Sequence, residues 1–154
     1  MARTQDDFEK FLRSDEFAGR LIRWVSIFES RLDSVLSAHF TPFKYDLGFD
    51  ELVLSRLSFA EKIDILRKIE LSRPLKSRDN IVYSLDRLRK LRNALAHNHY
   101  LSKQQIKKLR SDKWIQDFVT GFPGSFGREK NALENRFSLL WKHFARKHGL
   151  PKDA

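Results

Sequence analysis

The feature that most constrains the fold is a regular helical spacing of large side chains early in the chain. They recur at steps of three and four residues, at Phe17, Leu21, Trp24, Phe28, Leu32, Val35 and His39. This spacing predicts one long amphipathic helix, because residues three and four apart share a helix face. Helical spacing returns further along, and no stretch alternates as a strand would. We therefore expect an all-α protein: an up-and-down bundle of four main helices with additional short helices.

Capping and breaking residues mark the expected helix ends. Ser58–Glu61 and Ser102–Gln105 each match a capping box, in which a serine and a residue three positions later bond each other's backbone. The helix after Ser58 must stop before Pro74, because the residue preceding proline avoids the α region. A later helix ends near residues 97–98. Three glycines and a proline predict a loop over residues 120–127.

Composition limits the class of protein. The chain has 154 residues, a length typical of one domain, and we expect a single domain over residues 1–154. It has no cysteine, which excludes disulfides and thiolate metal sites. No apolar run approaches the ~20 residues needed to cross a bilayer, and the early acidic residues do not resemble a signal peptide. We therefore expect a soluble, cytoplasmic protein that does not bind membranes.

The net charge indicates a class of partner. Thirty Lys and Arg against 20 Asp and Glu give +10, with a pI near 10.0. The hydrophobic content of 41%, with 13 Phe and 3 Trp, excludes a basic disordered tail. A folded domain with this excess favours a polyanion, and nucleic acid is favoured over a membrane surface.

One charged residue occupies a position where an apolar one is expected. On a helical projection that starts at Ile81, Arg92 falls about 20° away, within the arc of the neighbouring leucines. A guanidinium buried alone is costly, so it requires a carboxylate, backbone carbonyls, a phosphate or a subunit interface. Asn93 and His97 lie on the flank of this arc, His97 about 140° from Arg92. A purely structural role is also open, since cations near a helix C-terminus interact favourably with its dipole.

The segment Arg92–His97, which reads Arg-Asn-Ala-Leu-Ala-His, resembles the R-x4–6-H motif of the HEPN superfamily. The resemblance extends over residues of about 14 to 100: a long early helix, a helix-loop-helix, and the motif at the end of a later helix. Residues of about 101 to 150 form a C-terminal extension outside it. Spacing alone is not specific, because Arg136 and His143 also satisfy it. The asparagine after the arginine, the helix-terminal position and the apolar arc distinguish the first pair.

The resemblance implies an activity. Many HEPN proteins are metal-independent endoribonucleases without a cofactor, and they act as dimers with the motif at the subunit interface. Carried over, Arg92 stabilises the phosphate, His97 is the general acid or base, and Asn93 orients the phosphate or the histidine. An imidazole that titrates near neutral pH suits deprotonation of a ribose 2′-OH, and a guanidinium suits the charge of the phosphorane. We therefore expect a homodimer that cleaves single-stranded RNA.

The same resemblance suggests supporting residues and partners. Glu29 and Asp33 on the early helix are expected to pair with the motif arginine or to tune its histidine. Some toxin members carry a tyrosine two residues after the histidine; here that position is His99, and Tyr100 follows. His99 is either a second catalytic group or a surface residue. A toxin or defence role implies an antitoxin or regulatory protein as a further partner.

A basic cluster follows the motif, consisting of Lys103, Lys107, Lys108, Arg110 and Lys113. It is expected to hold an RNA backbone through its phosphates, or else to be a solvated helix face. The chain has no His-x3-His pair and no carboxylates at ligand spacing, so we expect no metal site. Two alternatives to the nuclease stay open. One is a non-catalytic HEPN-like module for RNA binding, regulation or dimerisation, and the other is a bundle whose charge serves solubility.

Overall fold

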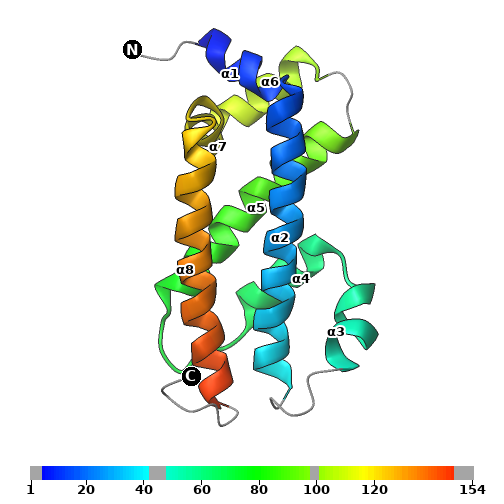
Figure 1. The fold of residues 1–154 in the computed structure, drawn as a ribbon, viewed down its shortest axis with the longest axis vertical. Helices are drawn as coiled ribbons and strands as arrows, with labels where there is room; N and C mark the ends of the chain where they lie inside the picture. The colour runs from blue at the N-terminus through cyan, green and yellow to red at the C-terminus, as the bar shows by residue number, and fades with distance from the viewer. Residues whose placement is uncertain (1–4, 42–47, 98–100, 148–154) are drawn as a thin grey trace. The chain divides into compact units, whose positions relative to one another are not determined.

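The structure is a computed structural model that describes residues 5–41, 48–97 and 101–147, without the side chains of Gln5, Asp6 and His97. These residues form helices and contain no strand, which confirms the all-α fold class (Figure 1). In chain order the elements are α1 (Gln5–Leu12), α2 (Asp15–Phe40), α3 (Phe49–Leu52), η2 (Leu54–Arg56), α4 (Phe59–Lys68), α5 (Lys76–His97), α6 (Lys103–Ser111), α7 (Lys113–Thr120) and α8 (Gly124–Lys147).

Three helices are long, where the sequence predicted four main ones. They are α2, α5 and α8, with 26, 22 and 24 residues, whereas α4 has only 10. The long helix predicted from the apolar spacing is α2, and α5 ends at His97 as predicted. Both predicted capping boxes are present, with each serine and its partner bonding the other's backbone. The up-and-down order of the bundle stays a prediction.

Contacts divide the chain into two compact units, each made of two segments. Unit 1 comprises Met1–Ser26 and Arg87–Ala132, and unit 2 comprises Ile27–Asp86 and Leu133–Ala154. The boundary falls within α2, α5 and α8. The expected single domain over residues 1–154 is a statement about the whole chain and stays a prediction.

An aromatic cluster forms the core of unit 1. Phe17 of α2 meets Phe118, Phe122 and Phe126 edge-on, with ring centroids 5.4–6.2 Å apart. Trp24 packs against Phe126 at 4.8 Å. All four phenylalanines are buried. The junction between α7 and α8 is therefore held by ring packing against α2.

This packing overturns the loop predicted for residues 120–127. Helix α7 continues to Thr120 and α8 already begins at Gly124, so only a short turn separates them. Glycine within a helix costs about 1 kcal/mol relative to alanine. Burial of Phe126 beside Gly124 and Gly127 outweighs that cost, since a buried phenylalanine contributes about 1.5–3 kcal/mol.

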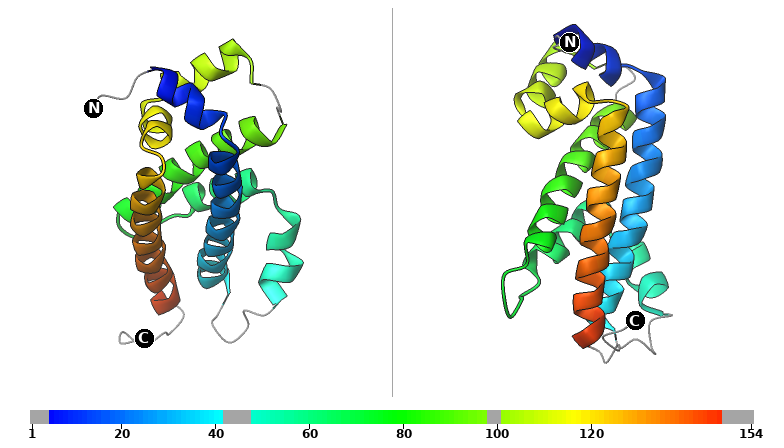
Figure 2. Two further views of the ribbon diagram at one scale, coloured as in Figure 1. Left: turned by 45° about the horizontal axis from the view of Figure 1, so that its top comes forward. Right: turned by 60° about the vertical axis from the view of Figure 1, so that its left-hand side comes forward.

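The N-terminal helix α1 packs against α6 and α7 in unit 1 (Figures 1 and 2). The guanidinium of Arg110 on α6 lies 5.1 Å from the ring centroid of Phe8 and 3.5 Å from the Glu9 carboxylate. In the turn between α1 and α2, Arg13 donates to the carbonyl of buried Leu101 at 3.4 Å. The hydrogen bond from Arg13 therefore holds Leu101, which lies two residues before the start of α6.

Unit 2 joins the second half of α2 to the C-terminal part of α8 and to α4. Phe28 and Phe137 stack with ring centroids 6.3 Å apart, and His39 lies 4.7 Å from the ring of Phe144. The guanidinium of Arg78 on α5 donates to the carbonyl of Ile69 at 2.7 Å and so caps the end of α4.

Candidate nucleic-acid interface

The motif arginine lies on the last turns of α5, in unit 1. Leu88 and Leu91 are fully buried and fix this part of the helix against its core. Arg92 is half-buried, within the apolar arc that the helical projection predicted. Its Nη2 donates to Oδ1 of Asn93 at 3.2 Å. The guanidinium is therefore turned along the helix surface toward the neighbouring asparagine.

A groove beside this asparagine runs between α5 and α6. It has a volume of about 630 Å³. The residues that line it are Arg89, Lys90, Asn93, Ala94, Gln105, Lys108, Leu109, Ser111, Asp112 and Ile115. Because Asn93 forms part of the wall and accepts from Arg92, the motif guanidinium touches a residue of the groove.

His97 occupies the final position of α5, four residues after Asn93. Residues four apart lie on the same side of a helix, so the backbone position of His97 is on the groove side. Its side chain lies outside the described part of the structure, as do His99 and Tyr100 entirely. Their expected catalytic roles therefore stay predictions.

The groove is lined by three cationic side chains and one carboxylate. Arg89 and Lys90 come from α5, and Lys108 comes from α6. The carboxylate of Asp112 already accepts from the backbone N–H of Ile115, as the N-cap of α7. It also lies 3.4 Å from the guanidinium of Arg87. The positive charges therefore dominate the groove, which makes it a place where phosphates are favoured.

The five predicted RNA-binding residues have different surroundings in the structure. Lys108 alone among them lines the groove. Arg110 is engaged with Glu9 and Phe8 of α1. Lys103, Lys107 and Lys113 are exposed and do not line the groove, and the helical period turns Lys107 about 100° away from Lys108.

Sequence reasoning missed two cations that the structure adds to the groove. Arg89 and Lys90 precede Asn93 and Ala94 by four residues each, so each pair shares a helix face. This spacing was present in the sequence. The spacing alone does not predict a groove, because nothing in the sequence showed that α6 would cover this face of α5.

Glu29 and Asp33, expected as supporting residues, form ion pairs in unit 2. The ammonium of Lys62 on α4 lies 3.3 Å from the Glu29 carboxylate and 2.9 Å from the Asp33 carboxylate. Lys62 is buried, with 4% of its surface exposed. This triad gives both carboxylates a partner, Lys62, that the sequence did not predict.

Burial and charge shift the pKa values of Asp33 and Lys62. Burial raises the pKa of Asp33. The hydrogen bond and charge of Lys62 oppose this increase only in part, and the negative charges of Asp50 and Glu29 add to it. Burial alone would lower the pKa of Lys62, but Asp33 and Glu29 together outweigh it, so that pKa is raised. The raised pKa of Asp33 is therefore mainly an effect of burial, whereas the raised pKa of Lys62 is an effect of its two carboxylate partners.

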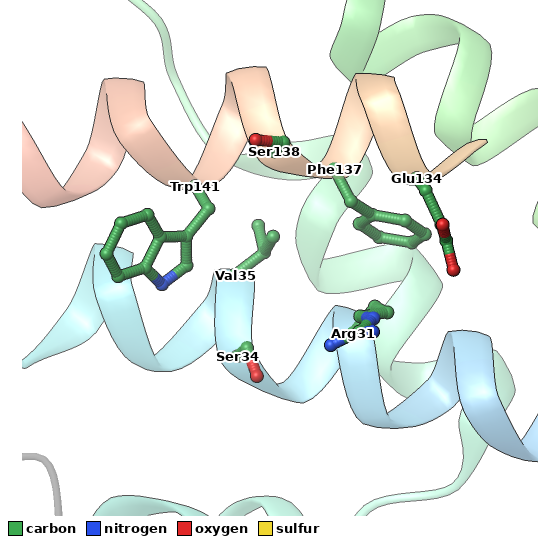
Figure 3. A pocket seen from close by; sticks show the side chains of 7 residues that line it. All are labelled: Arg31, Ser34, Val35, Glu134, Phe137, Ser138 and Trp141. Carbon is green, nitrogen blue, oxygen red and sulfur yellow. The ribbon is translucent and has the colours of Figure 1, made fainter. Parts of the chain in front are cut away.

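A second cavity, of about 390 Å³, lies in unit 2 between α2 and α8 (Figure 3). Val35 and Phe137 point between the two helices, Trp141 lies at one end, and Arg31 and Glu134 lie at the other. Its single arginine is matched by its single glutamate. This balance makes it a poorer phosphate site than the groove of unit 1.

The second spacing match, Arg136 and His143, lies on α8 in unit 2, and Phe137 rather than an asparagine follows its arginine. Burial, followed by the positive charges of Arg73, Lys147 and Arg146, lowers the pKa of His143. Arg136 therefore serves as a matched control for Arg92.

Comparison with known protein families, with curated proteins and with solved structures returns no match to this chain. Within the described ranges, no three His, Asp or Glu side chains gather as metal ligands would. None of the helices described here combines the length and apolar character of a membrane span. The groove between α5 and α6 is therefore the feature that indicates a function.

Proposed function

We propose that the protein binds single-stranded RNA in the groove between α5 and α6 and cleaves it there without a metal ion. The hydrogen bond from Arg92 to Asn93 carries the proposal, because it connects the motif guanidinium to the wall of a cationic groove. The resemblance of Arg92–His97 to the HEPN motif supports the same reading. A phosphate in the groove is attracted by Arg89, Lys90 and Lys108.

The proposed chemistry is transesterification within the RNA. His97, as general base, takes the proton of a 2′-OH, whose oxygen then forms a bond to the adjacent phosphorus. The bond from phosphorus to the 5′-oxygen breaks, and that oxygen receives a proton from a general acid. Arg92 stabilises the negative charge of the phosphorane, and Asn93 holds the guanidinium in place. The products are a 2′,3′-cyclic phosphate and a 5′-hydroxyl.

A homodimer is part of this proposal, because two-fold symmetry supplies a second arginine and histidine to one site. The acid that protonates the leaving oxygen can then come from the partner subunit. A toxin or defence component acting on RNA, restrained by an antitoxin or regulatory protein, is the biological role that fits such an activity.

One observation favours a second function, that of a non-catalytic RNA-binding or dimerisation module. Arg92 is half-buried and hydrogen-bonded within its own helix, as an arginine with a structural role is. In that case the groove still attracts phosphates, but the motif residues only shape it.

The test is incubation of varied single-stranded RNAs with the purified protein in EDTA. We expect cleavage that is lost in Arg92→Ala and in His97→Ala and retained in Arg136→Ala. An RNA gel shift without cleavage would assign the second function. Absence of both at low salt would refute RNA as the partner.

A matched pair on α6 tests where the RNA lies. Lys108 lines the groove, whereas its neighbour Lys107 does not line it and points about 100° away around the helix. We expect Lys108→Gln to reduce the slope of log affinity against log salt by about 0.7, the contribution of one phosphate contact on a single strand. Lys107→Gln should leave the slope unchanged. Equal effects from the two variants would place the RNA elsewhere.

A further inference from the structure

Unit 1 contains a smaller cavity that the proposed chemistry does not use. It has a volume of about 180 Å³ and lies where α7 meets the start of α8. The residues that line it are Trp114, Asp117, Phe118, Ser125, Arg128 and Glu129. It therefore combines an aromatic wall, a guanidinium and carboxylates in a small volume.

The aromatic wall is held rigidly. The indole of Trp114 stacks on Phe118 with ring centroids 5.0 Å apart and planes 9° apart. Phe118 is buried and packs in turn on Phe126 at 4.9 Å. Trp114 itself is half-exposed, so one ring face rests on the core while the residue also borders the cavity. Fixed, partly exposed aromatic rings of this kind are stacking platforms for unpaired bases.

Two glycines make room for the guanidinium at the rim. A Cβ added at Gly121 would lie 3.1 Å from Nη2 of Arg128, and one added at Gly124 would lie 3.3 Å from Nη1. The guanidinium therefore lies directly over the turn that joins α7 to α8. Ser125 donates to the carbonyl of Phe118 at 2.5 Å and fastens the same turn.

The polarity of the cavity indicates its ligand. The carboxylates of Asp117 and Glu129 repel a phosphate, which excludes a second backbone site. Carboxylates accept hydrogen bonds from N–H groups, and arginine donates to carbonyl oxygen and ring nitrogen. Guanine carries the O6 and N7 acceptors that arginine prefers, next to the N1–H and N2–H donors that a carboxylate prefers. Adenine and cytosine offer a carboxylate only one amino group, so guanine, with two neighbouring acceptors and two neighbouring donors, fits this pair of groups best.

We propose that this cavity binds an unpaired guanine of the RNA held in the α5–α6 groove. The inference rests on the proposed function, since it names a base of the same substrate. The two sites share α7: Asp112 and Ile115 border the groove, and Trp114 and Asp117 border the cavity. The helical period places these two pairs of residues on opposite sides of α7, and a helix with its side chains is ~10–12 Å across. A strand a few nucleotides long can therefore place its phosphates in one and a base in the other.

The experiment measures the affinity of the full chain for two short oligonucleotides by fluorescence anisotropy. One is an oligouridylate, and the other carries a single guanosine in the same sequence. We expect the guanosine to tighten binding about tenfold, the discrimination that a bidentate contact to a base edge provides. This gain should disappear in Trp114→Ala and in Asp117→Asn, while oligouridylate binding stays as in the wild type.

Trp141→Ala in unit 2 is the matched control and should keep the gain. Trp114→Ala removes the stack on Phe118 and can disturb α7. Asp117 is exposed, so Asp117→Asn keeps the fold and tests the site independently. Equal binding of both oligonucleotides by the wild type, or a gain that survives in both cavity variants, overturns the guanine site. If Lys108→Gln still weakens binding in that case, the proposed function stands; if the wild type binds neither oligonucleotide, both fail.

Discussion

Replacement of the buried lysine of unit 2 should destabilise the protein strongly. Lys62 has 5% of its side chain exposed and pairs with Asp33 at 2.9 Å and Glu29 at 3.3 Å. Methionine has nearly the same length and no charge, so Lys62→Met leaves two carboxylates beside an apolar group. Removal of one partner from a buried ion pair costs about 3–5 kcal/mol, because the remaining charge is left uncompensated.

The magnitude in this protein should fall at or below the lower end of that range. The side chains of Glu29 and Asp33 keep 29% and 19% of their surface exposed, so water can screen part of the freed charge. We expect a loss of about 2–3 kcal/mol in the free energy of unfolding at pH 7. For a chain of this size that corresponds to a decrease of about 4–12 °C in Tm.

Urea titration followed by circular dichroism measures the loss. The deficit should shrink as the pH falls through the raised pKa of Asp33, because a neutral carboxyl no longer requires the ammonium. Addition of Glu29→Gln and Asp33→Asn to Lys62→Met should restore most of the stability. A single variant within about 0.5 kcal/mol of the wild type at pH 7, or a triple variant no better than the single one, would refute this account of the triad.

Three further predictions concern other parts of the chain. Ser102→Ala removes the capping box of α6 and should cost about 1 kcal/mol, measured by urea titration. Gly127→Ala, with open space around its Cβ, should stabilise by about 0.5–1 kcal/mol, whereas Gly121→Ala meets backbone at 3.0 Å and should destabilise by about 1–3 kcal/mol. Because the pKa of His143 is lowered on folding, this residue contributes stability that is present above pH 6.5 and is lost as the pH falls below 6.5. His143→Gln should therefore flatten the decline of Tm at low pH in thermal melts. A decline identical to that of the wild type would contradict this prediction.

Local rules were sufficient for the helix ends and the long amphipathic helix. The serines at 58 and 102 satisfy their capping boxes because that geometry depends only on residues within one turn. Likewise, five of the six periodic apolar positions of α2 are buried as the spacing predicts, and the sixth, Trp24, is half-buried. Arg92 and Asn93 could be assigned to the end of one helix for the same reason.

Features that depend on contacts between distant segments could not be predicted. The pairing of Lys62 with Glu29 and Asp33 joins residues about 30 positions apart. Glu29 and Asp33 are four residues apart on one helix, and this spacing does not indicate which cation they meet. The helical state of Gly124 depends on aromatic packing that outweighs its weak helix propensity. The groove itself requires α6 to lie against one face of α5, which sequence spacing does not specify.

The most direct test of the central claim is a cleavage assay in EDTA with a ribose substitution. A single-stranded RNA is compared with the same strand carrying a 2′-deoxyribose at the position that is cut. The account predicts cleavage of the all-ribose strand alone, with a 2′,3′-cyclic phosphate on the upstream fragment, and its loss in Arg92→Ala. Cleavage at the deoxy position, or full activity in Arg92→Ala, would contradict it.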